Sequence, residues 1–84
     1  MNALTKADAV RLPALEVQTN PQVGSLYLWE DFTDAHHTFF VRPVTVGEST
    51  CLVDVFGIHD GSVKPLGRER FIRQGDGLFR CFVE

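Results

Sequence analysis

The residues best able to do chemistry in this sequence are its histidines and carboxylates, but their spacing matches no catalytic or metal-binding pattern. The nearest approach to a metal-ligand set is Asp34, His36, His37 and His59. Adjacent strand residues point to opposite faces, whereas zinc needs three or four protein ligands around one point. No histidine is arranged with a serine or cysteine as a catalytic base, and no phosphate loop is present. The sequence therefore predicts no metal, no cofactor and no enzyme.

Residues 29–34 form a group better suited to binding than to catalysis. Trp29 is followed by a polar loop at residues 30–35, in which Phe32 lies among the acidic residues Glu30, Asp31 and Asp34. Aromatic residues with a charged rim are typical of the parts of interfaces that concentrate binding energy. We predict a protein-binding site made of Trp29, Glu30, Asp31, Phe32 and Asp34. A negative rim speeds encounter with a positive surface, so the expected partner is a protein with a basic surface. A simple solvated loop is the alternative.

Four arginines near the C-terminus define a second candidate surface, for nucleic acid. They are Arg68, Arg70, Arg73 and Arg80, with Phe71, Phe79 and Phe82 interleaved. Bases can stack on aromatic rings while arginines contact phosphate. The alternative is that the phenylalanines belong to the core and the arginines cover it with their aliphatic stems.

Composition limits the function classes further. The 84 residues predict one domain, with a formal net charge of −3. Residues 1–59 hold three basic and seven acidic side chains, and residues 60–84 hold five basic and four acidic ones. The acidic balance makes nucleic acid an unlikely general partner and confines any such site to the C-terminal part. Cys51 and Cys81 are expected to be buried thiols, with a disulfide as the alternative.

No stretch of about 18 apolar residues exists that could span a membrane. The N-terminal segment also lacks the apolar core of a signal peptide, because Lys6, Asp8 and Arg11 interrupt it. We therefore expect a cytoplasmic protein without a membrane partner.

The elements that must position these residues are organised around residues 36–57, the longest apolar stretch. It is rich in Phe, Val and Thr and is divided at residues 47–49, which predicts two antiparallel strands joined by a short loop. Asp60-Gly61 predicts a tight two-residue hairpin after the second strand. Pro43 cannot donate a ladder hydrogen bond and so marks a bulge or an edge. The break at residues 64–67 predicts only a short strand directly after the hairpin.

The predicted fold is mainly β, or α+β at the margin, in a single domain over residues 1–84. A short helix is expected at about 5–12, where Thr5 and Asp8 can form a capping box. Strands are expected at about 14–19, 23–30, 36–46, 50–58, 68–73 and 78–83. These five to six strands form a curved antiparallel sheet or a small barrel, because a flat sheet would leave long edges exposed. The predicted core is Leu15, Val17, Leu26, Leu28, Phe39, Val41, Val53, Val55, Phe79 and Cys81.

Two stretches resemble the motifs of the Sm-like barrels. Gly24-Ser25-Leu26, followed by Trp29, Glu30 and Asp31, resembles the first motif, a Gly-x-Leu followed by an aromatic residue and Asp. Phe71-Ile72-Arg73-Gln74-Gly75 is similar to the second, an apolar-Ile-Arg-Gly strand, with an extra Gln before Gly75. The first motif lacks its RNA-contacting Asn. The resemblance implies a helix followed by a five-stranded, RNA-binding barrel.

Two functions follow as hypotheses. The first is a non-enzymatic protein that occupies a partner's surface, since small regulators and inhibitors of bacteria and phages have this size and composition. Its expected partner is a nucleic-acid-binding protein. The alternative is an Sm-like or SH3-like nucleic-acid-binding module that uses the four arginines. Self-association through the sheet edge of the C-terminal strand, which has no Pro or Lys to guard it, stays open.

Overall fold

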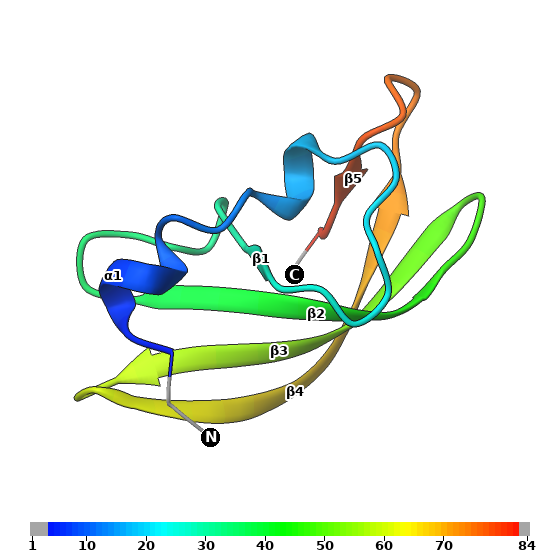
Figure 1. Cartoon of the computed structure of the whole chain (residues 1–84). Helices are drawn as coiled ribbons and strands as arrows, with labels where there is room; N and C mark the ends of the chain where they lie inside the picture. Colours follow the sequence, from blue (N-terminus) through cyan, green and yellow to red (C-terminus); the bar gives the residue numbers. More distant parts are fainter. Residues whose placement is uncertain (1–3, 83–84) are drawn as a thin grey trace.

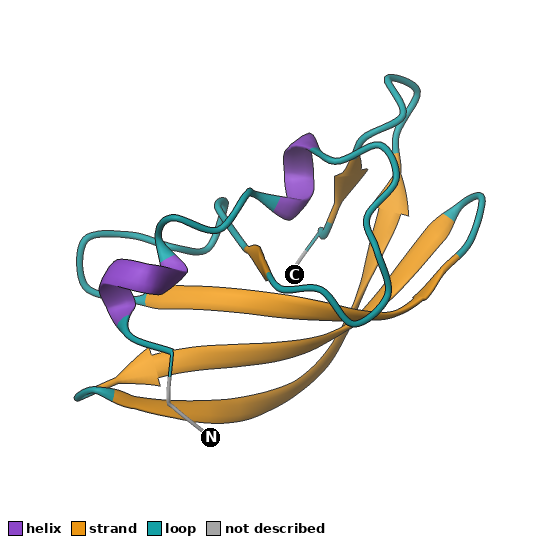
Figure 2. Cartoon of the chain, viewed as in Figure 1, coloured by secondary structure: helices purple, strands orange, loops and turns teal. Residues whose placement is uncertain are grey.

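The computed structural model describes residues 4–82, which form a mainly β structure with short helical turns before the sheet (Figures 1 and 2). Five antiparallel strands follow one another in the order β1-β2-β3-β4-β5 and curl into a half-barrel. This arrangement confirms the predicted fold class. The elements are α1 (Lys6–Ala9), the 3-10 helix η1 (Leu15–Val17), β1 (Tyr27–Leu28), β2 (Thr38–Val46), β3 (Thr50–His59), β4 (Ser62–Arg73) and β5 (Phe79–Arg80).

The central strand of the sheet is β3, which pairs along its length with β2 on one side and β4 on the other. Its alternating sequence places Cys51, Val53 and Val55 on the concave face, where all three are buried, as predicted. The rest of the core comes from segments on both sides of β3 in the sequence. It comprises Leu15, Tyr27, Trp29, Val41, Phe71 and Phe79. The sheet therefore curls around side chains supplied from outside β3.

The β3–β4 hairpin turns on Asp60 and Gly61, with φ angles of 50° and 75°. Positive φ at both central positions is the type I′ geometry, whose twist matches that of the flanking strands. His59 pairs with Ser62 directly across this turn. The predicted two-residue hairpin is confirmed.

Two bulges help the long strands to curl. The register of β2 on β3 shifts between Pro43 and Thr45, so that Val44 is the extra residue. Of the two alternatives predicted at Pro43, a bulge or an edge, the structure has the bulge. The register of β3 on β4 shifts between Val55 and Phe56, so that Leu66 is the extra residue of β4. An extra residue bends its strand and increases the local twist. The predicted break at residues 64–67 is thus wrong. The chain forms a bulge there, and β4 continues through it for 12 residues in all.

The N-terminal helix is shorter than predicted. Thr5 and Asp8 form the expected capping box, but α1 ends at Ala9 rather than Leu12. The N–H groups of Arg11 and Leu12 donate to the carbonyls three residues earlier, so the helix tightens before Pro13. A proline disfavours helical geometry at the residue before it, so the chain leaves this helical turn at Leu12.

The strand predicted at 14–19 is wrong. Residues 15–17 form η1, in which Leu15 is buried, Glu16 is only 5% exposed and Val17 is 60% exposed. The Glu16 carboxylate accepts hydrogen bonds from the backbone N–H groups of Glu30 (3.1 Å) and Asp31 (2.8 Å). This tertiary contact turns Glu16 inward and reverses the alternation on which the strand prediction depended.

The outer strands are also shorter than predicted. The strand expected at 23–30 is reduced to Tyr27–Leu28, because the chain turns at Gly24, where φ is 85°. The strand expected at 78–83 is reduced to Phe79–Arg80, and Val83 lies outside the described residues. Of the ten predicted core residues, only Val17 is more than half exposed. The phasing of the long strands is therefore confirmed.

Gly61→Ala should lower the free energy of unfolding by about 1 kcal/mol, since a side chain is strained at positive φ. Gly75→Ala is the matched control, because Gly75 has no positive φ and its new methyl group would meet nothing within 4 Å. Urea denaturation monitored by Trp29 fluorescence measures both. Equal stabilities of the two variants would contradict the role given to the I′ turn.

Candidate protein-binding pocket on the open side of the half-barrel

The acidic loop, residues 29–37, joins β1 to β2 and is held by backbone hydrogen bonds at both ends. The N–H of Trp29 donates to the carbonyl of Phe39 (2.9 Å), and the N–H of Asp34 donates to the carbonyl of His37 (2.8 Å). The Thr33 hydroxyl also accepts a bond from the N–H of Phe39 (2.9 Å). The backbone of the acidic loop is therefore held in a defined conformation.

Trp29 is not the exposed anchor that the sequence predicts. Its side chain is 2% exposed and packs edge-on against Phe71 in the core. Phe32 stacks on Trp29 with ring centroids 4.1 Å apart and remains 41% exposed. The half-barrel needs a large side chain to fill its concave face, and Trp29 meets that need. Phe32 is therefore the aromatic residue that this loop presents to the surface.

The carboxylates of the loop differ in their surroundings. Asp31 forms an ion pair with Arg80 (3.3 Å). Asp34 accepts hydrogen bonds from the backbone N–H groups of His36 and His37, which hold the pKa of its carboxyl below the ordinary value. Glu30 is exposed and has no side-chain partner among residues 4–82. Of these three carboxylates, Glu30 is thus the one whose charge is most available to a partner.

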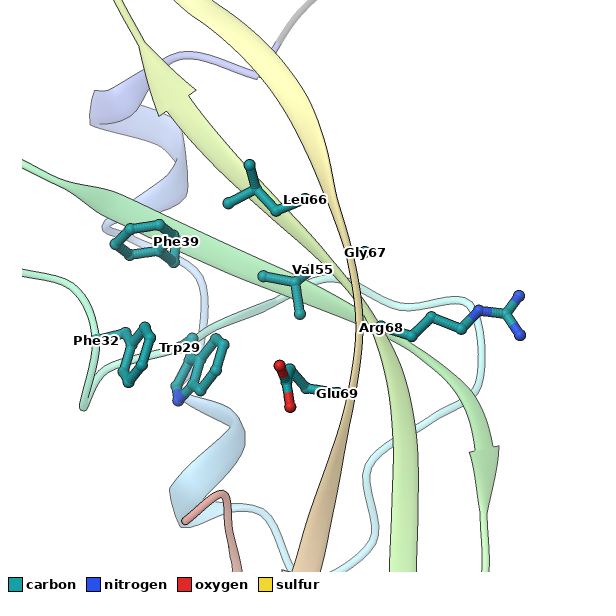
Figure 3. Close-up of a pocket in the computed structure, with 8 residues that line it drawn as sticks. All are labelled: Trp29, Phe32, Phe39, Val55, Leu66, Gly67, Arg68 and Glu69. Atoms are coloured by element: carbon teal, nitrogen blue, oxygen red, sulfur yellow. The ribbon is translucent and has the colours of Figure 1, made fainter. Parts of the chain in front are cut away.

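A pocket of about 140 Å³ lies between this loop and β4 (Figure 3). Its walls include Trp29, Phe32, Phe39, Val55, Leu66 and Glu69. Leu66 is 55% exposed and reaches over Gly57 beside Phe39, where a methyl group on Gly57 would come within 2.9 Å of it. The pocket is thus flanked by two exposed apolar side chains, Phe32 from the loop and Leu66 from the bulge in β4.

Glu69 is the only acidic residue in the wall of this pocket. Its carboxylate is on the same side of β4 as Trp29, whereas the neighbouring Arg68 side chain projects away from the pocket (Figure 3). The guanidinium of Arg68 instead donates to Asp54 (2.8 Å). Sequence reasoning missed both Leu66 and Glu69, because their shared position depends on the bulge and on which face of β4 each residue takes.

The pocket adjoins an open strand edge. On its outer side β4 pairs with β5 only at Ile72 and Arg73, and no other described strand pairs with that edge. The predicted edge for self-association was the C-terminal strand, but β5 is short and η1 contacts it. The long unpaired edge within residues 4–82 is therefore that of β4, with Lys64, Pro65 and several charged residues along it. Such residues are typical guards against uncontrolled strand pairing.

The four arginines of the alternative site do not form one surface. Arg73 donates from Nη1 to the carbonyls of Thr19 and Gly77 (2.8 Å each) and from Nε to that of Glu48 (2.7 Å). Its guanidinium also lies 4.2 Å from the centre of the Phe79 ring. Arg73 therefore ties three segments together and is part of the structure itself.

Of the other three arginines, Arg68 and Arg70 lie on one face of β4, two residues apart, whereas Arg80 lies on β5. Arg80 pairs with Asp31, and Arg68 shares Asp54 with Arg42 (3.3 Å) on the opposite face of the sheet. These two partners lower the pKa of the Asp54 carboxyl, with the Arg68 hydrogen bond the larger cause. Arg70 is exposed and has no ion pair within the described part of the chain. Three of the four arginines are thus already engaged by protein groups.

The structure brings His36, His37 and His59 together in the lining of one pocket of about 340 Å³ between the acidic loop and the β3–β4 hairpin. His37 contacts Asp34 (3.2 Å), and His59 contacts Asp60 (3.2 Å). Across residues 4–82, no three side chains of His, Cys, Asp or Glu come together as a metal-ion site would require.

Both cysteines are free, with Cys51 buried and Cys81 partly buried. Burial raises the pKa of each thiol to about 11, and for Cys81 the nearby Glu69 carboxylate adds to this effect. The reactive form of a cysteine is its thiolate, so neither residue has the environment of a nucleophile.

Comparisons with protein-family models, with curated proteins and with solved structures found no match. The resemblance to the Sm-like barrels therefore gains no support from them. No helix in the described part of the chain is long and apolar enough to cross a membrane.

Arg73→Ala should lower the free energy of unfolding by about 2 kcal/mol or more, because it removes the hydrogen bonds that this side chain donates to backbone carbonyls in three segments. Arg70→Ala, the matched control, should change it by less than about 0.5 kcal/mol. Chemical denaturation of both variants measures the difference. An Arg73→Ala protein as stable as the parent would contradict this structural role and leave Arg73 available to bind a ligand.

The raised thiol pKa values predict a loss of stability in alkali. An unfolded chain releases its thiol protons near pH 9, while the folded chain keeps them to about pH 11. The unfolded state therefore binds fewer protons across this interval, and the free energy of unfolding falls as the pH rises through it. Urea titrations from pH 8 upward measure the slope. The double variant Cys51→Ala, Cys81→Ala should show a shallower slope, and an unchanged slope would contradict the assignment.

Proposed function

We propose that this protein is a non-enzymatic binding module that holds a partner protein in the pocket between the acidic loop and β4. The observation that carries this proposal is the pair of exposed apolar side chains, Phe32 and Leu66, on opposite sides of one aromatic-lined pocket. Single exposed apolar residues are ordinary on protein surfaces. Two of them flanking a pocket form the kind of feature that anchors an interface.

The size of the pocket favours a protein side chain as its occupant. Pockets for cofactors and small substrates usually enclose about 300 to 1,000 Å³. At about 140 Å³ this pocket is too small for that class of ligand. Interfaces, in contrast, concentrate their binding energy where one side chain of a partner fills one pocket.

The charges near the pocket support a partner with a basic surface. Glu30 and Asp34 on the loop and Glu69 on β4 are exposed. Opposite charges across an interface increase the association rate and exclude wrongly charged partners. A protein that occupies a basic surface in this way would act as a regulator or inhibitor of its partner, such as a nucleic-acid-binding protein.

The nucleic-acid-binding alternative has weaker support. It requires the arginines near the C-terminus to present their guanidinium groups together to phosphates. Arg73 instead binds backbone carbonyls, and Arg68 and Arg80 pair with aspartates. We therefore place the function at the pocket and not at the arginines.

The test is to remove both apolar side chains that flank the pocket. A Phe32→Ser, Leu66→Ser double variant should bind the partner at least about tenfold more weakly, because anchor side chains dominate interface energy. The matched control is Val23→Ser, Ile72→Ser, which removes two exposed apolar side chains that do not line the pocket. This control should bind within about twofold of the parent.

The measurement has two stages. Immobilised parent, pocket variant and control are first compared for stoichiometric capture of one protein from a bacterial lysate. The captured protein is then purified and titrated with each variant. A folded pocket variant that binds as tightly as the parent would exclude the pocket as the site.

A further inference from the structure

Glu69 is a charged residue on a face of the sheet that is otherwise used for packing. It pairs in register with Val53, and its neighbours on the concave face of β4 are Gly67 and the fully buried Phe71. The one hydrogen bond to its side chain in residues 4–82 comes from the Cys81 thiol, at 3.9 Å. A thiol is a weak donor, so this contact does little to balance a carboxylate.

The cation nearest along the chain is turned away from this carboxylate. Arg68 lines the pocket, but its guanidinium projects to the opposite side of β4 and pairs with Asp54 (Figure 3). In the part of the chain that the structure describes, Glu69 has no ion pair of its own. The pocket therefore contains one negative charge without a matching positive one.

The remaining wall of the pocket is aromatic and aliphatic. Trp29, Phe32 and Phe39 contribute rings, and Phe39 lies edge-on to Phe32 with centroids 5.8 Å apart. The faces of aromatic rings attract cations, by about 0.5 to 1 kcal/mol at exposed sites. Leu66 and Val55 offer apolar surface suited to an aliphatic chain.

These features together fit a long cationic side chain. We propose that the pocket binds an arginine or lysine side chain of the partner protein, with its aliphatic stem against Leu66 and Phe39 and its charged end at Glu69. This inference rests on the proposed function, since it names the group that enters the same pocket. The charge complementarity of Glu69 and the volume of about 140 Å³ both select one such side chain.

The experiment uses short peptides, so that it does not depend on knowing the partner. The full chain, labelled with ¹⁵N, is titrated with acetyl-Gly-X-Gly-amide in which X is arginine, lysine, citrulline or norleucine. Citrulline and norleucine are neutral counterparts of the two cationic residues. Amide shifts should appear at Phe32, Leu66 and Glu69. The cationic peptides should bind about tenfold more tightly than the neutral ones.

Two variants separate the charge of the pocket from its shape. Glu69→Gln should remove the preference for the cationic peptides and leave the weak binding of norleucine unchanged. Glu48→Gln is the matched control, because Glu48 is an exposed glutamate in the β2–β3 turn and lines no part of this pocket. It should behave as the parent. The ¹⁵N spectrum of each variant also shows whether the fold is intact.

The outcomes distinguish this inference from the proposed function. Equal binding of neutral and cationic peptides at the pocket would overturn the cationic side chain but leave the pocket as a binding site. An unchanged preference in Glu69→Gln, or shifts confined to other residues, would likewise overturn it. The proposed function is decided separately, by whether the Phe32→Ser, Leu66→Ser variant loses its protein partner.

Discussion

Incomplete closure of the sheet is the constraint on which the rest of this structure depends. The three long strands, β2, β3 and β4, form a continuous antiparallel ladder, but β1 and β5 are only two residues each. A full barrel would cover its own interior with side chains from every strand. Here the concave face must be covered from outside the sheet, and Leu15 of η1 and Trp29 at the end of β1 do so.

Segments without regular structure have backbone N–H and C=O groups that lack the hydrogen-bond partners a β ladder provides. Two charged side chains supply some of these missing partners. The Glu16 carboxylate accepts hydrogen bonds from two backbone N–H groups of the acidic loop. The Arg73 guanidinium donates hydrogen bonds to backbone carbonyls of three other segments. An anion for donors and a cation for acceptors is the pairing that gives the stronger, charge-assisted hydrogen bonds. These two residues therefore hold loops where longer strands would otherwise be needed.

The candidate site follows from the same constraint. A space remains between β4 and the acidic loop, because β4 bends at the Leu66 bulge and pairs on its outer side only at Ile72 and Arg73. Trp29 fills the inner part of that space, and Phe32 covers Trp29 from the loop. The pocket is the part of that space that these two rings leave unfilled. Its carboxylate, Glu69, comes from the strand, and its exposed apolar sides come from two different elements.

Only those features of the site that depend on a single segment of the chain were predictable from the sequence. The acidic loop was recognised from its composition, and Phe32, Glu30 and Asp34 do lie at the surface. The same composition predicts an exposed Trp29, yet Trp29 is buried, since a sequence pattern does not reveal which large side chain fills the interior. The arginines looked like one cluster because they are close along the chain. The structure gives Arg68, Arg73 and Arg80 different protein partners.

The sequence by itself determined the elements whose causes are local. Asp60-Gly61 specifies a tight two-residue turn, Pro43 limits its position to a bulge or an edge, and the alternation around Val53 phases the central strand, because each depends on neighbouring residues or on period. Tertiary structure alone decided the rest. Glu16 faces inward because distant N–H groups need an acceptor, and Leu66 meets Phe39 because β4 bulges against β3. Such contacts join residues far apart in the chain, so no local pattern of residue types contains them.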